Sequence, residues 1–138
     1  MLRLALAMFL VLCTSPAQTR AAAYVVIAHP NLAGTEISGN DMRGIFLGAI
    51  TRVGGRPVQP VVARSGDVHK QFVADCLGKT ESGLQNYFRT LVFTGKGSPP
   101  KSFATAVEII DYVSHTEGAI GYVSLDANLT GVVRLEPK

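Results

Sequence analysis

One segment of this sequence has residue types suited to holding a small anion: Arg64-Ser65-Gly66-Asp67-Val68. It lies between a β-prone run, residues 58–63, and a helical pattern. Free backbone N–H groups at the helix start would therefore lie beside a guanidinium and a hydroxyl, a combination that suits phosphate, sulfate or carboxylate. Alternatively, Ser65 or Asp67 only caps the helix and Arg64 is solvated. The Asp67 carboxylate would repel a fully ionised anion but could accept a hydrogen bond from a protonated one.

A second segment, Thr94-Gly95-Lys96-Gly97-Ser98, has the composition of a phosphate-binding loop. A Walker loop needs a glycine five residues before its Gly-Lys pair and a hydroxyl residue directly after the lysine. Thr90 and Gly97 stand at those two positions. The segment is therefore predicted to be a flexible connection, from which Lys96 could at most contact a ligand or partner.

The histidines and the serine of the anion segment do not form a recognisable catalytic or metal-binding pattern. His29, His69 and His115 lie on separate predicted elements, without the spacing of metal ligands. The G-x-S-x-G context of a nucleophilic serine is absent around Ser65. We therefore expect no catalytic residue, metal or cofactor, and we expect His69 to be an exposed helix residue.

Hydrophobic runs and periodicity predict the elements that would position these residues. Strands are expected at residues 24–28, 58–63, 119–124 and, more weakly, 132–135, with Pro60 placing the second at an edge or irregular position. Four helices are expected, the first with Ser38 and Asp41 as a capping box. The other three have apolar faces that contain Val68, Phe72, Cys76 and Leu77; Leu84, Phe88 and Leu91; and Phe103, Val107, Ile110 and Val113. Residues 93–101 are expected to be a loop.

This order of elements predicts an α/β fold, a three-layer sandwich around a mainly parallel sheet. Ligands of such sheets collect beyond the carboxyl ends of the strands. Three segments are expected there: residues 29–35, residues 64–68 and the segment after Ser124.

Composition and the first residues limit the class of protein. The 138 residues are 47% hydrophobic with a formal net charge of +3, which indicates one globular domain and excludes a nucleic-acid binder with a broad basic face. Residues 1–23 have the pattern of an export signal, with cleavage near Ala17 or at Ala21-Ala22-Ala23. A lipoprotein signal at Cys13 is an alternative, although Leu12 is not small. We therefore expect a periplasmic or secreted domain over residues 24–138, without stable membrane insertion, whose one thiol, Cys76, is inert in the core.

Four segments together resemble phosphate-type substrate-binding proteins of ABC transporters. They are Asp41-Met42-Arg43-Gly44-Ile45-Phe46-Leu47-Gly48, Pro60-Val61-Val62-Ala63-Arg64, Phe93-Thr94-Gly95-Lys96-Gly97 and Gly118-Ala119-Ile120-Gly121-Tyr122-Val123. The resemblance covers residues 24–125 and implies one lobe of a type II periplasmic binding protein fold. It further implies that Arg64 clamps the anion, that Ser65 and Gly66 donate hydrogen bonds, and that Asp67 holds a phosphate proton. Val68 stands where a hydroxyl would help.

The resemblance leaves two functions open. One is an exported, non-catalytic solute-binding domain for a small oxyanion such as phosphate, working with an ABC transporter permease or an envelope sensor. The other is a single-lobe interaction or sensory accessory module that no longer binds a ligand. Because the chain is about half of a two-lobed protein, we expect either weak, solvent-exposed binding or a homodimer that supplies the missing wall.

Overall fold

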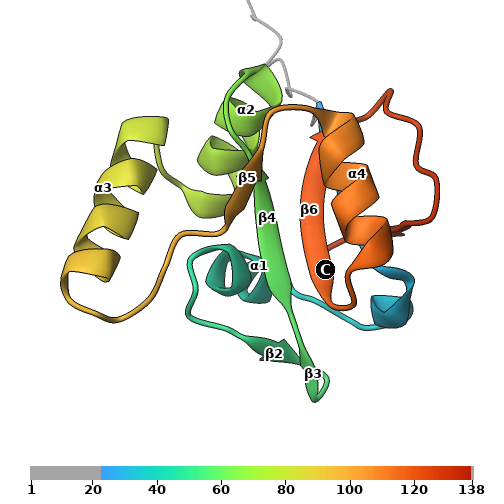
Figure 1. The fold of residues 1–138 in the computed structure, drawn as a ribbon, viewed down its shortest axis with the longest axis horizontal. Helices are drawn as coiled ribbons and strands as arrows, with labels where there is room; N and C mark the ends of the chain where they lie inside the picture. The colour runs from blue at the N-terminus through green and yellow to red at the C-terminus, as the bar shows by residue number, and fades with distance from the viewer. Residues whose placement is uncertain (1–22, 138) are drawn as a thin grey trace, which may run out of the picture.

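A computed structural model describes residues 23–137, so the predicted export signal lies outside the described residues apart from its last position. The elements in chain order are β1 (Tyr24–Ala28), the 3-10 helix η1 (Pro30–Leu32), α1 (Gly39–Phe46), β2 (Arg52–Val53), β3 (Arg56–Pro57), β4 (Gln59–Ala63), α2 (Asp67–Leu77), α3 (Glu81–Phe93), β5 (Lys101–Phe103), α4 (Ala106–His115), β6 (Ala119–Ser124) and β7 (Val133–Leu135). Strands β2 and β3 form a separate small hairpin that projects from the body (Figure 1).

The main sheet has the strand order β5-β4-β6-β1-β7. Strand β4 pairs in parallel with both β5 and β6, whereas β1 is antiparallel to β6 and to β7. Four of the five strands therefore point the same way and β1 points the other way. The prediction of an α/β fold with a mainly parallel sheet is confirmed.

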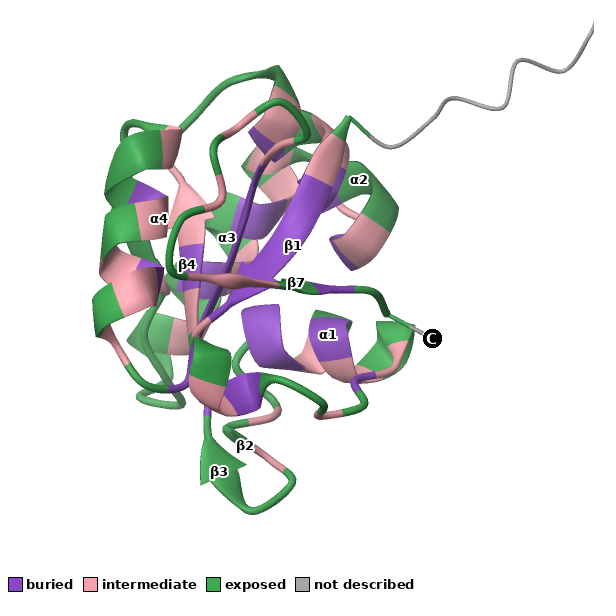
Figure 2. Cartoon of the chain, turned by 90° about the vertical axis from the view of Figure 1, so that its right-hand side faces the viewer, coloured by how far each residue is buried: buried purple, intermediate pink, exposed green. Residues whose placement is uncertain are grey.

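Helices cover both faces of this sheet and make three layers (Figures 1 and 2). Alternate residues of β1 point to opposite faces, as the pleat of a strand requires. Val25 and Ile27 pack in the core beneath α4, and Val26 and Ala28 pack in the core beneath α1 and α2. Helix α3 adds Leu84 and Phe88 to the second core.

The capping box predicted at the start of the first helix is confirmed. The Ser38 side chain accepts a hydrogen bond from the Asp41 backbone N–H at the start of α1, and the reciprocal bond completes the capping box. Thr80 caps α3 through the Gly83 N–H. Gly78 ends α2 in the left-handed conformation, with φ of 62°, which only glycine adopts at little cost.

Pro60 predicted an edge or irregular position for its strand, and the edge alternative is wrong, because β4 lies between β5 and β6. Backbone N–H groups of β4 alternate between its neighbours: Gln59 donates to Gly118 beside β6, and Arg64 donates to Phe103 in β5. The nitrogen of Pro60 therefore faces the β5 side. There the ladder starts only at Val61, which pairs with Lys101, so no hydrogen bond is lost.

The predicted fourth helix starts too early. Phe103 ends β5, and Thr105 is the N-cap of α4. With this later start, the buried residues of the helix are Ile109 and Val113. Val107, which was predicted to lie on the apolar face, is 77% exposed.

His69 is buried, contrary to the prediction that it is exposed. It is the third residue of α2, and its ring lies stacked near that of the fully buried Tyr122. The Tyr122 hydroxyl oxygen is 2.5 Å from His69 Nδ1, and it accepts a hydrogen bond of 3.1 Å from the Ala63 N–H. The hydroxyl proton needs an acceptor inside the core, and Nδ1 provides it. This junction of Tyr122, His69 and Ala63 ties β6 to the end of β4 and to the start of α2.

Tyr122→Phe tests how much this junction stabilises the fold. It leaves the partly buried Ala63 N–H and the buried His69 Nδ1 without their partner, which costs about 1–3 kcal/mol of unfolding free energy. Urea denaturation measures the loss. Tyr112→Phe is the matched control, because its hydroxyl bonds to Gln59 at the exposed surface and its removal should change stability much less. Equal losses in the two variants would contradict the assigned importance of the junction.

The buried histidine also predicts a pH dependence of stability. Burial lowers the pKa of His69 below its ordinary value of 6.5, partly offset by the nearby Glu81 carboxylate. As the pH falls below about 6.5, the unfolded chain takes up a proton at this residue before the folded protein does, so the unfolding free energy decreases. Asparagine at this position can still accept the Tyr122 proton through Oδ1 but does not titrate. Urea denaturation across this pH range should give a flatter profile for His69→Asn, and an unchanged slope would count against the assignment.

Candidate anion-binding site

The five predicted residues form one continuous surface segment at the carboxyl end of β4. Residues 64–66 connect Ala63 to the first residue of α2, Asp67. The Arg64 N–H is fixed by a hydrogen bond of 2.8 Å to the Phe103 carbonyl, while residues 64–67 are exposed and Val68 is half-buried. The backbone of the segment is thus anchored at both ends, and its side chains are open to solvent.

The start of α2 differs from the starts of the other three α-helices. Those three have Ser38, Thr80 and Thr105 as N-caps, and each side chain accepts a backbone hydrogen bond. In α2 the N-cap is Gly66, with φ of 108° and no side chain to fill this role. Ser65 and Asp67 flank the N-cap without occupying it. The first N–H groups of α2 therefore receive no bond from the N-cap residue, and they carry the positive end of the helix dipole.

The charges around this helix start oppose each other. The Arg64 guanidinium and the uncapped N–H groups attract an anion, whereas the Asp67 carboxylate in the first turn repels one. Because these groups are exposed, their interaction with an ion competes with water. The segment by itself has the chemistry of a weak anion site.

A groove of about 230 Å³ adjoins the segment, and Arg64 lines it. Its apolar walls come from Leu84, Phe88, Pro99 and Pro100. Its polar lining consists of Arg64, His69, Glu81, Gln85 and Ser102. Glu81 was not predicted as a site residue, because periodicity within one helix does not show which of its residues faces another helix.

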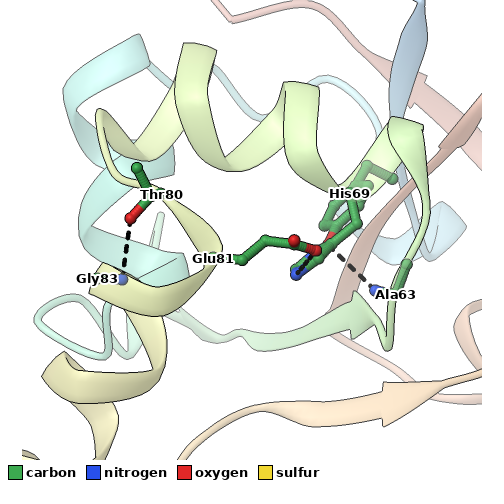
Figure 3. Close-up of polar contacts among 6 residues, drawn as sticks. Ala63, His69, Thr80, Glu81 and Gly83 are labelled. Carbon is green, nitrogen blue, oxygen red and sulfur yellow. Dashed lines mark hydrogen bonds and ion pairs between the residues drawn. The ribbon is translucent and has the colours of Figure 1, made fainter.

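Glu81 extends from the first turn of α3 toward His69 on α2 (Figure 3). Its Oε1 lies 3.9 Å from His69 Nε2, beyond hydrogen-bond reach. Burial is the main reason that the pKa of Tyr122 is raised, and the field of Glu81 raises it further. The hydroxyl therefore stays protonated and keeps its proton directed at Nδ1.

Not every predicted ligand segment lies at this edge. Because β1 is antiparallel to its neighbours, its carboxyl end faces the opposite edge of the sheet: Ala28 pairs with Ile120, near the start of β6. Residues 29–35 therefore lie away from residues 64–68, contrary to the prediction. The segment after Ser124 does lie at the same edge as residues 64–68, since β6 is parallel to β4.

The remaining residues considered from the sequence lie elsewhere. Lys96 lines a different groove of about 390 Å³, which also involves α1, α3 and residues 97–100 before β5. The Cys76 thiol is half-buried, and burial raises its pKa to about 11. The thiol therefore stays protonated at neutral pH, and the protonated form is unreactive. Within residues 23–137, no group of three or more metal-ligating side chains gathers, and no helix is long and apolar enough to cross a membrane.

No protein-family profile matches the sequence, and no curated protein matches it. Solved structures do resemble the fold. An ABC-type phosphate transport receptor from Vibrio cholerae is 12% identical with a TM-score of 0.61, and the match covers 83% of this chain and 45% of that chain. A putative phosphate ABC transporter substrate-binding protein with bound phosphate, from Clostridium perfringens, is 17% identical with a TM-score of 0.62, covering 83% and 44%.

A third structure, PstS from Borrelia burgdorferi, is 18% identical with a TM-score of 0.53, and the match covers 75% of this chain and 40% of that chain. The chain thus spans less than half the length of each of these proteins. At these identities the likeness shows the fold. The chain has the α/β fold found in part of these phosphate transport proteins, as its sequence motifs predicted.

Proposed function

We propose that this chain is a non-catalytic solute-binding domain for a small oxyanion, with phosphate as the first candidate. The observation that carries the proposal is the start of α2, where a glycine N-cap leaves backbone N–H groups uncapped beside exposed Arg64 and Ser65. Helix starts of this kind bind phosphate and carboxylate groups. In this proposal Arg64 clamps the anion, Ser65 and Gly66 donate hydrogen bonds, the Asp67 carboxylate accepts a hydrogen bond from a protonated anion, and Val68 borders the site.

The similar structures support phosphate over other oxyanions, since one is an ABC-type phosphate transport receptor and another is a putative phosphate ABC transporter substrate-binding protein with bound phosphate. Carried over to this chain, they favour a role in ABC-type uptake or sensing in the periplasm, with a permease or a sensor as partner. We propose that residues 1–23 direct this export and that residues 24–138 form the binding domain.

A second candidate is an accessory module with the same fold that binds no ligand. Two observations favour it. The Asp67 carboxylate in the first turn opposes anion binding, and two exposed apolar side chains lie near the same sheet edge: Val107, at the start of α4, and Leu125, just after β6. A partner protein or a second copy of this chain would cover these side chains and would also wall the site from water.

Arg64→Ala separates the two candidates. Calorimetric titration of the purified protein with phosphate and with sulfate should show binding by the unsubstituted chain. The variant should lose affinity by about tenfold to a hundredfold, because a charge-assisted hydrogen bond contributes roughly 1.5–3 kcal/mol. Arg89→Ala is the matched control, since Arg89 is an exposed arginine on α3, and it should bind as the unsubstituted chain does. Absence of binding to either anion at millimolar concentration would favour the accessory module.

A further inference from the structure

Two residues of opposite charge line the groove that adjoins residues 64–68. Arg64 supplies a guanidinium and Glu81 a carboxylate. Lys70, although close in sequence, lines a separate depression on α2 with Asp67 and Asp75. The groove is therefore positive where it adjoins the anion segment and negative where α3 begins.

The Glu81 carboxylate has no cationic partner at neutral pH within the part of the chain that the structure describes. Its one ion-pair contact there is His69 Nε2 at 3.9 Å, which is charged only when the ring is protonated. The ring is held neutral, because Nδ1 must accept the buried Tyr122 proton. The His69 side chain is 9% exposed. Its Nε2–H faces Glu81, and among residues 23–137 it has no hydrogen-bond acceptor, so two polar groups in this groove are available to a ligand.

The groove is also larger than a bare oxyanion requires. A water molecule accounts for about 30 Å³ of liquid, so 230 Å³ holds several atoms beyond those of a phosphate group bound at Arg64. Leu84, Pro99 and Pro100 also line it, and their apolar surfaces suit methylene groups. The shape and charge together suit a short ligand with an anion at one end and a cation at the other.

We propose that this groove binds the organic part of an aminoalkyl phosphate, a small phosphomonoester that carries an ammonium group. The phosphate group binds at Arg64 and the start of α2, which rests on the proposed function. The methylene groups lie against Pro99, Pro100 and Leu84, and the ammonium reaches the Glu81 carboxylate. The His69 Nε2–H is placed to donate to an ester oxygen of the same ligand.

The test compares four probes by calorimetric titration of the purified protein: inorganic phosphate, ethyl phosphate, O-phosphoethanolamine and ethanolamine. O-phosphoethanolamine should bind about tenfold more tightly than ethyl phosphate, because the two differ by the ammonium that meets a partly desolvated carboxylate. Glu81→Gln should remove this preference while keeping the affinity for ethyl phosphate. Thermal unfolding of the variant, followed by circular dichroism, checks that it is folded.

Asp75→Asn is the charge-matched control. Asp75 is an exposed carboxylate on α2 outside this groove, so its removal changes the net charge equally and should leave the preference intact. Equal affinities for ethyl phosphate and O-phosphoethanolamine would overturn the groove proposal and leave the oxyanion function standing. A preference that Glu81→Gln does not remove would also overturn it. Absence of binding by all three phosphate-bearing probes would instead overturn the proposed function, and the groove proposal with it.

Discussion

The hydroxyl of Tyr122 is the buried polar group on which the geometry of the candidate site depends. It lies in a fully buried side chain, so the oxygen and its proton must each find a partner inside the protein. The Ala63 N–H and His69 Nδ1 are those partners, and they stand at the last residue of β4 and the third residue of α2. One oxygen therefore fixes where the strand ends and where the helix is placed, and residues 64–66 must span the gap between them.

This arrangement holds the backbone of the anion segment while leaving its side chains free. The hydrogen bond from Arg64 N–H to Phe103 adds a third anchor, and the positive φ of Gly66 turns the chain into the helix without a side-chain cap. Such a segment loses little backbone entropy when it binds an ion. What it lacks is a wall, because exposed charges interact weakly across water.

Most of the fold could be predicted because its signals are local. The buried strands are continuous apolar runs, and the helices begin at capping residues such as Ser38 and Thr80.

Three features could not be predicted, since each depends on a partner distant in sequence. Strand β5 has only three residues and gains its conformation from pairing with β4. The direction of β1 is set by its pairing with β6. The burial of His69 depends on its contact with Tyr122, which is 53 positions away in the sequence. Glu81 belongs to the candidate site for the same reason.

The hydrogen bond between Tyr122 and His69 therefore also affects the electrostatics of the groove, because His69 contacts Glu81 as well. A histidine that lies 3.9 Å from a carboxylate would ordinarily gain a proton and neutralise it. Here the gain of that proton would displace the Tyr122 hydroxyl proton from its buried acceptor, and burial opposes the charge as well. The ring stays neutral for reasons that lie in the core, and the charge of Glu81 is left facing the groove. A cationic residue at position 69 could not accept the tyrosine proton and would neutralise Glu81, so it would change the stability of the fold and the charge of the groove together. Packing around Tyr122 thus determines which ligand charges the surface beside Arg64 can attract.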